Sequence, residues 1–269
     1  MKTGICNEIF SGWSIEETIK YVKKVGYDGL EIAPFTLASS VVEISVEDRK
    51  KIKSVAKEHD LEIIGTHWLL VKPEGLSISS PDPRLRKKTS QYFVGLVKFT
   101  SDIGGKIMVL GSPKQRFIGQ NQTRQQVIGY FKEVIKEPLE IAKEKNITIC
   151  LEPLARKETN FVNTATEAIS IIKEINHPNL KLMLDVKAMT DEKRPYQEII
   201  KEGKEYLCHF HANDENLLGP GFGNVDFAPI IDALKQISYN GYISVEVFDF
   251  SPGPEVIAEK SIQYLKKFL

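Results

Sequence analysis

Short apolar or β-branched runs alternate with longer amphipathic segments along the whole chain. This alternation is typical of repeated strand and helix units built around a parallel sheet. We count eight such units, and in each of them a helical pattern follows the strand. The predicted strands are Lys2–Phe10, Gly29–Pro34, Glu62–Leu69, Lys106–Leu110, Ile147–Leu154, Lys181–Val186, Tyr206–His211 and Tyr242–Phe248.

Capping signals support the same division of the chain. Ser14 followed by Glu17 predicts a capping box at one helix start, and Ser45 followed by Asp48 predicts a second helix start. The longest insertions span residues 71–83 and 112–123, and both follow strands, where α/β barrels carry their catalytic loops. Glycine or asparagine stands where helices should end, at Gly26, Gly104, Gly105, Asn146 and Gly241.

Chain length and motif content select among the α/β folds. Eight units in 269 residues favour one closed (β/α)8 TIM barrel, a single domain over residues 1–269. No GxGxxG or Walker-type glycine loop follows the first strand, which argues against a dinucleotide- or nucleotide-binding fold. No linker, repeat array or low-complexity tract indicates a second domain.

Charge and cysteine content narrow the class of protein. The 36 basic residues balance 36 acidic ones, so no net field draws the chain to nucleic acid or to a membrane surface. The chain has no apolar stretch of about 18 residues and no signal-peptide pattern. Cys6, Cys150 and Cys208 are far apart and each lies in an apolar run, which suits reduced core thiols. We therefore expect a cytoplasmic protein that binds neither nucleic acid nor membrane.

Four polar side chains interrupt the apolar runs near the carboxyl ends of the last four predicted strands: Glu152, Asp185, His211 and Glu246. Inward positions at the ends of neighbouring barrel strands converge on one point above the core. Three carboxylates buried together oppose one another's ionisation unless a cation is present. Each residue alone could be a helix cap or a solvated rim group, but together they predict a site for one divalent metal ion. This N/O ligand set suits Mn²⁺ first, with Mg²⁺, Co²⁺ or Zn²⁺ as alternatives.

The segments EPLARKETNFVNT, LMLDV, HFHAND and VEVFDF resemble the xylose isomerase-like TIM-barrel superfamily, and within it the sugar phosphate isomerase/epimerase group of D-tagatose and D-psicose 3-epimerases. GYDGLEIAPF and GGKIMVLGSP extend the resemblance over nearly the whole chain. The resemblance implies that Glu152, Asp185, His211 and Glu246 bind the metal. It also implies that Glu152 and Glu246 are the catalytic acid/base pair, that Glu158 hydrogen-bonds Glu152, and that the protein is a homodimer or homotetramer.

The expected chemistry follows from such a site. A ketose that binds a metal through its carbonyl and an adjacent hydroxyl has an acidified neighbouring C–H, so a carboxylate can remove the proton to form an enediolate. Return of a proton to the opposite face is epimerisation, and return to the adjacent carbon is aldose–ketose isomerisation. We predict a divalent-metal-dependent isomerase or epimerase that acts on a sugar or a sugar derivative.

Two positions depart from the ketohexose epimerases, which carry a histidine three residues after the strand-six aspartate and an arginine six residues after the strand-seven histidine. This chain has Ala188 and Leu217 there, so the residues that hold the O1–O3 end of a free ketohexose are missing. Lys187 shares a face with Asp185 if the strand continues, and it is a candidate to hold a phosphate, carboxylate or enolate oxygen. The alternative is a lysine that extends into solvent.

Six further residues are candidates from their positions in the pattern. Glu31 and His67, on the second and third strands, are candidate substrate contacts, with a core or rim position as the alternative. Arg116 is a candidate for anionic substrate groups, with a solvated loop as the alternative. We expect His209 to pack one pleat below the strand-seven ligand, and Asn213 and Asp214 to orient that ligand or a metal-bound water.

Other functions stay open beside the isomerase. A metal-dependent lyase or dehydratase would use the same enolate to expel a β-oxygen from a keto-sugar or oxidised glycoside. A nuclease of the endonuclease IV type would need a trinuclear zinc site with more histidines than the five present, and a basic groove. A non-catalytic sugar-sensing role is a further alternative.

Overall fold

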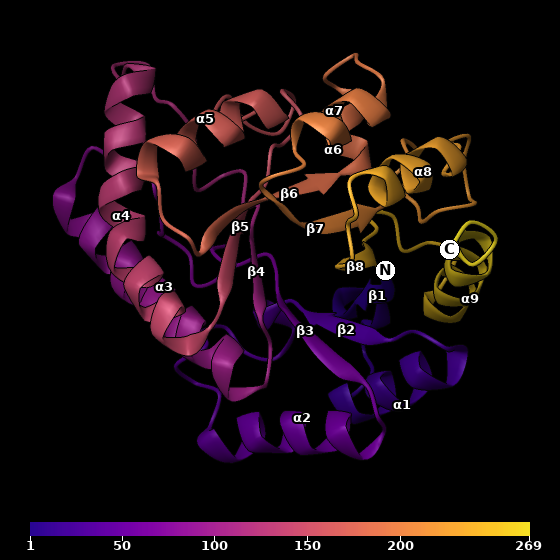
Figure 1. Cartoon of the computed structure of the whole chain (residues 1–269). Helices are drawn as coiled ribbons and strands as arrows, with labels where there is room; N and C mark the ends of the chain where they lie inside the picture. Colours follow the sequence, from indigo (N-terminus) through magenta and orange to yellow (C-terminus); the bar gives the residue numbers. More distant parts are fainter.

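The computed structural model describes residues 1–269 and contains a closed barrel of eight parallel strands (Figure 1). The strands pair in chain order, and β8 pairs with β1 to close the ring. The predicted fold class, an α/β TIM barrel, is therefore confirmed. The strands are β1 (Lys2–Cys6), β2 (Gly29–Ile32), β3 (Glu62–Thr66), β4 (Ile107–Leu110), β5 (Thr148–Leu151), β6 (Leu180–Asp185), β7 (Leu207–Ala212) and β8 (Tyr242–Val245).

Helices surround the strands on the outside of the ring (Figure 1). Two 3₁₀ helices, Asn7–Phe10 and Pro34–Thr36, follow β1 and β2. The α-helices are α1 (Ile15–Val25), α2 (Val46–Glu58), α3 (Pro83–Asp102), α4 (Arg124–Lys145), α5 (Ala165–Ile175), α6 (Val186–Thr190), α7 (Tyr196–Glu202), α8 (Ala228–Gln236) and α9 (Pro254–Leu265). None of them combines the length and apolarity needed to cross a bilayer.

The predicted helix boundaries rest on caps that form as expected. Ser14 and Glu17 make a reciprocal capping box at the start of α1, and the Ser45 side chain accepts a hydrogen bond from the backbone N–H of Asp48 at the start of α2. Gly26 and Asn146 end α1 and α4 in the left-handed conformation, with φ of 101° and 54°. These local signals fix where the helices begin and end.

Several strands are shorter than predicted, because the hydrogen-bonded pairing with the neighbouring strands stops before the apolar run ends. β1 ends at Cys6, and Asn7 begins a 3₁₀ helix while its side chain accepts a hydrogen bond from the Ala33 N–H at 2.7 Å. β3 ends at Thr66, since Trp68 adopts a φ of 52° that no extended strand allows. The segments predicted as the ends of these strands are therefore a 3₁₀ helix after β1 and a loop after β3.

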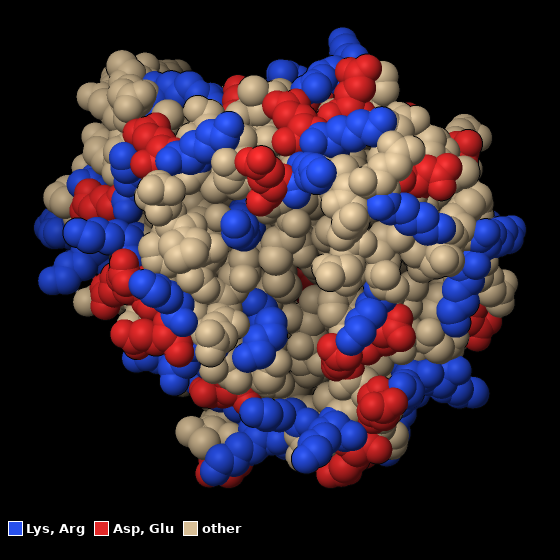
Figure 2. All heavy atoms as spheres, viewed as in Figure 1, with Lys and Arg blue, Asp and Glu red and all other residues tan.

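The apolar core has two parts. A cluster of 66 buried residues includes the side chains that pack the strands against the helices. A separate small cluster of Val109, Cys150 and Met183, from β4, β5 and β6, fills part of the barrel interior. Polar groups such as Glu31 and His209 are buried on β2 and β7. On the molecular face of Figure 2, basic and acidic side chains are intermixed.

Candidate functional site

The structure brings the four predicted metal ligands together at one end of the barrel. Glu152 directly follows β5, Asp185 ends β6, His211 lies in β7, and Glu246 directly follows β8. All four are buried, and one ligand atom from each lies within 4.8 Å of the ligand atoms of the other three. Four consecutive strands therefore deliver three carboxylates and one imidazole to one point, as parallel strands of a barrel do.

Neighbouring residues make room for the Glu152 side chain and hold that of Asp185 in place. A Cβ at Gly111 would lie 1.6 Å from Glu152 Oε2, so only glycine at this position leaves room for the carboxylate. Asp185 Oδ1 accepts a hydrogen bond from the Ala188 N–H at 2.8 Å, and Asp185 Oδ2 accepts one from the amide of Asn213. The Asp185 carboxylate is thus oriented by the protein itself, as metal ligands usually are.

Burial and mutual repulsion set the protonation of the acidic groups. Burial, together with the charges of Glu246 and Asp185, raises the pKa of Glu152 to about 8. The pKa of Glu246 is lowered, because the charge of His211 and its hydrogen bond of 3.0 Å to Glu246 Oε2 outweigh the effect of burial. Two carboxylates whose pKa values are pushed apart are typical of an acid and base pair.

The quartet fits a divalent ion. One ligand atom from each of the four buried residues lies within 4.8 Å of the other three, so these side chains can approach a single ion together. Three carboxylates and one imidazole suit Mn²⁺ or Mg²⁺ as well as Zn²⁺ or Co²⁺. A cation would also relieve the repulsion that raises the pKa of Glu152.

Metal binding should weaken as the pH falls, because an ion must displace protons from the quartet. The pKa of Glu152 is raised to about 8. Below pH 8 a proton on the Glu152 carboxylate competes with the metal, and above pH 8 the carboxylate is mostly free of that proton. The apparent affinity should therefore fall by up to about tenfold for each pH unit below the Glu152 pKa. Calorimetric titration with Mn²⁺ on either side of that pKa measures the effect. An affinity that stays constant or rises towards acid pH contradicts this prediction.

A pocket opens beside the quartet. Glu152 and Glu246 line it together with His67, Trp68 and Phe248. The rings of Trp68 and Phe248 meet edge to face, with centroids 6.2 Å apart. The carboxylates of Glu152 and Glu246 therefore face a space with an aromatic wall.

Lys187 lines the same cavity, and its surroundings keep it charged. Its Nζ lies 2.8 Å from Glu158 Oε1 and 3.6 Å from the centre of the Phe248 ring. The charges of Asp185 and Glu158 raise the pKa of Lys187 despite its burial. The alternative of a lysine in solvent is wrong. The expected continuation of strand six is wrong too, because the Asp185 side chain caps α6 at Ala188 and the chain turns into a helix.

Glu158 differs from what the resemblance implies. Its Oε1 pairs with Lys187, and its Oε2 accepts a hydrogen bond from the Ala155 N–H at 3.2 Å, so the implied hydrogen bond to Glu152 is absent. The nearby ammonium group of Lys187 explains the difference, because a charge-assisted pair is stronger than a bond between two carboxyl groups.

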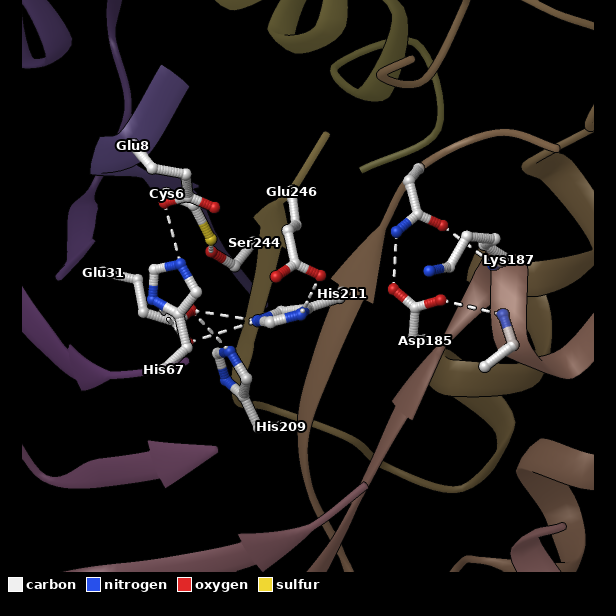
Figure 3. Close-up of polar contacts among 12 residues, drawn as sticks. Cys6, Glu8, Glu31, His67, Asp185, Lys187, His209, His211, Ser244 and Glu246 are labelled. Carbon is white, nitrogen blue, oxygen red and sulfur yellow. Dashed lines mark hydrogen bonds and ion pairs between the residues drawn. The ribbon is translucent and has the colours of Figure 1, made fainter. Parts of the chain in front are cut away.

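Glu31 does not line the cavity, and the expectation that it contacts substrate is wrong. Its side chain is fully buried, its Oε2 accepts a hydrogen bond from His209 Nε2 at 2.8 Å, and its two oxygens lie 3.2 and 3.3 Å from His211 Nε2 (Figure 3). The two histidines lower the pKa of Glu31 well below its usual range despite burial. Glu31 therefore fixes the His211 ring from below. His209 lies behind His211, where it was expected.

Arg116 is fully buried but does not line the cavity, so neither expected position, beside substrate or in a solvated loop, is correct. Its Nη1 donates to the Leu110 carbonyl oxygen at 3.4 Å, and burial lowers its pKa to about 10 even though Glu152 and Glu158 oppose this. The loop from residue 112 folds inward over β4, which buries the guanidinium beside the two carboxylates.

Asp214 was expected to orient His211 or a metal-bound water, and this expectation is wrong. Its Oδ2 accepts a hydrogen bond from the Val225 N–H at 3.0 Å, so it ties together the loop between β7 and α8. The preceding residue, Asn213, contacts the metal site instead, because its amide donates to Asp185. Of the two polar residues at the end of β7, the first faces the site and the second faces the loop.

Comparison with known proteins agrees with this architecture. Residues 19–268 match a family model described as the xylose isomerase-like TIM barrel. The D-psicose 3-epimerase of Ruminiclostridium cellulolyticum is 29% identical over 234 residues, which cover 86% of this chain and 77% of that protein. The 3-dehydro-D-guloside 4-epimerase of Escherichia coli is 23% identical over 257 residues, which cover 91% of this chain and 92% of that protein.

Solved structures share the fold over the full length. The crystal structure of D-psicose 3-epimerase with D-tagatose from Clostridium cellulolyticum superposes with a TM-score of 0.87 at 25% identity, covering 100% of this chain and 99% of that chain. The 3-keto-D-glucoside 4-epimerase from E. coli, without ligand, superposes with a TM-score of 0.86 at 21% identity, covering 99% of each chain. The barrel and the order of its elements are therefore common to these proteins.

Proposed function

The chain belongs to the xylose isomerase-like TIM barrel family, and from this premise we propose that it is a divalent-metal-dependent epimerase or isomerase of a keto-sugar or keto-sugar derivative. Its relatives include ketose 3-epimerases and a 3-dehydro-D-guloside 4-epimerase, which are enzymes of the isomerase class. One observation carries the proposal: the four ligand atoms of Glu152, Asp185, His211 and Glu246 converge beside a cavity that both glutamates line.

The proposed reaction divides the proton transfers between two glutamates. A divalent ion held by the quartet would polarise the carbonyl and an adjacent hydroxyl of the keto-sugar. Glu246, whose pKa is lowered, takes the proton from the carbon beside the carbonyl, which leaves an enediolate. Glu152, the other carboxyl group that lines the pocket, supplies the proton that returns to the other face. Lys187 stabilises the oxygen on which negative charge develops.

The substrate we propose is a modified keto-sugar, such as an oxidised glycoside. Ala188 and Leu217 stand where ketohexose epimerases hold a free ketose, while the buried cation of Lys187 lies in the cavity wall. The alignment with the E. coli relative covers 92% of that protein, which is named for a 3-dehydro-D-guloside. We also propose a homodimer or homotetramer in the cytoplasm, where the three free cysteines would stay reduced.

The experiment that tests this function is a proton-exchange screen in D₂O with added Mn²⁺. Ketoses, sugar phosphates and 3-keto-glycosides are incubated with the protein, and each recovered sugar is analysed for deuterium and for mass. Deuterium on the carbon beside the carbonyl of an intact sugar supports an epimerase or isomerase. Release of water or of an aglycone supports the lyase instead, and lack of deuterium in every class of sugar refutes the proposal.

Replacing Lys187 with methionine keeps the length of the side chain and removes its charge. Because the ammonium group is proposed to stabilise developing negative charge, Lys187→Met should lower the catalytic rate constant by about 10²-fold. Lys201→Met, an exposed residue of α7, is the matched control and should react at the wild-type rate. Steady-state rates on the best substrate of the screen decide the matter, and a Lys187→Met enzyme as fast as the control contradicts the role.

A further inference from the structure

A second group of potential metal ligands is buried beside the quartet, near the carboxyl ends of β1 and β3. Cys6 ends β1, Glu8 lies in the 3₁₀ helix that follows, and His67 directly follows β3. One ligand atom from each of these residues, together with one from Glu246, lies within 4.8 Å of all the others. We propose that Cys6, Glu8, His67 and Glu246 form a second divalent-metal site that shares Glu246 with the first.

Unpaired atoms in this group point to a ligand. Glu8 Oε2 accepts a hydrogen bond from His67 Nε2 at 2.8 Å, but Glu8 Oε1 is buried without any partner. A buried carboxylate oxygen without a partner is destabilising, and native proteins rarely leave one. The contact of the Cys6 thiol with Ser244 Oγ is long, at 3.8 Å. A cation between these side chains would satisfy Glu8 Oε1 and use the free sulfur lone pairs.

The chemistry of the donors selects a different metal from that of the quartet. A thiolate, an imidazole and two carboxylates form a mixed S/N/O set, which favours Zn²⁺ or Co²⁺ over Mn²⁺ and Mg²⁺. The quartet offers no sulfur. Binding at the second site requires that the Cys6 thiol lose its proton, which passes to solvent as the metal–sulfur bond forms.

The shared glutamate gives the second site a consequence for catalysis, which rests on the proposed function. Glu246 Oε2 faces His211 Nδ1 at 3.0 Å, and in Figure 3 the other carboxylate oxygen is directed towards the side of Cys6 and His67. Figure 3 places Cys6, Glu8 and His67 on one side of Glu246 and Asp185 on the other. A cation among Cys6, Glu8 and His67 holds the oxygen that would otherwise accept the substrate proton. Zinc at this site is therefore inhibitory.

Cobalt titration of the metal-free full chain tests the site without any measurement of activity, because thiolate-bound Co²⁺ has a near-ultraviolet charge-transfer band. We expect two Co²⁺ ions per wild-type chain and a charge-transfer band. Cys6→Ser should lose the band and one ion, whereas the control Cys150→Ser, which changes a buried thiol outside the cluster, should keep both. Glu8→Gln keeps the thiol and should weaken the band-forming step by at least about tenfold.

Two further experiments distinguish a failure of the second metal site from a failure of the proposed function. Asp185→Asn damages only the quartet, so its cobalt band should persist. Zn²⁺ added to the Mn²⁺-loaded protein should inhibit deuterium exchange, and Cys6→Ser should need at least about tenfold more Zn²⁺ for the same fractional inhibition. No band in the wild type, or a band that persists in Cys6→Ser, overturns the site. Equal zinc inhibition of wild type and Cys6→Ser overturns the inhibitory role. Failure of the proposed function would instead leave the band intact and abolish exchange on every sugar.

Discussion

Glu246→Gln should reduce substrate proton exchange by about 10²–10⁴-fold, the contribution of one general base. Glutamine has nearly the same shape as glutamate but cannot take a proton from carbon. In the structure Glu246 lines the cavity, and the hydrogen bond from His211 helps to keep its pKa low, so its carboxylate is the ionised partner of the pair. Deuterium uptake by the best substrate of the exchange screen measures the loss.

Two controls keep this result interpretable. Glu255→Gln makes the same chemical change at an exposed position of α9 and should exchange at the wild-type rate. Mn²⁺ affinity of Glu246→Gln is measured in parallel, and exchange is compared at saturating metal, because Glu246 is also a proposed ligand. A variant that exchanges as fast as Glu255→Gln under these conditions refutes the assignment of Glu246 as the base.

Chelation of the metal should reduce exchange by at least about 10³-fold, since Lewis-acid polarisation contributes several kcal/mol to such reactions. Activity should return when Mn²⁺ is added back to the same preparation. A bound ion at 100 times its dissociation constant also stabilises the fold by about 2.7 kcal/mol, so the melting temperature should fall on chelation and recover with the metal. Exchange that continues unchanged in a protein shown to be metal-free contradicts the proposed mechanism.

The barrel could be predicted from the sequence because each strand and helix carries its own periodic signal. The ends of the strands could not be predicted, because each depends on a single residue whose backbone stops pairing with the neighbouring strand. Trp68 with its positive φ, and Asn7 with its hydrogen bond to the Ala33 N–H, end β3 and β1 inside continuous apolar runs. Hydrophobic pattern does not record a change of φ at one residue, so the predicted strands were too long.

The quartet was found because a carboxylate or imidazole inside an apolar strand has few structural explanations. The depth of a side chain in the barrel was harder to infer. Glu31 shares the inward face of its strand with substrate-facing positions, but it lies below the metal ligands and pairs with His209 and His211. Strand alternation gives the face of a residue and not its level along the barrel axis.

The exact partners of the site residues could not be identified from the sequence. Asn213 orients Asp185 across 28 positions of sequence, and Glu8 meets His67 across 59 positions. Asn213 and Asp214 were both candidates because they closely follow the predicted ligand His211, but the sequence did not show which of the two contacts the site. Glu8 lay inside a predicted strand, where the turn into a 3₁₀ helix was not foreseen.

Deuterium uptake as a function of Mn²⁺ concentration, in wild type and in Asp185→Asn, tests the central claim most directly. Asp185 is proposed to bind the metal without transferring a proton, so its loss should raise the Mn²⁺ concentration for half-maximal uptake by at least about tenfold. Wild-type uptake should depend on a single Mn²⁺ ion per chain. Identical Mn²⁺ dependence in the two proteins, or uptake that needs no metal in either, would show that the four converging side chains do not hold the ion that activates the substrate.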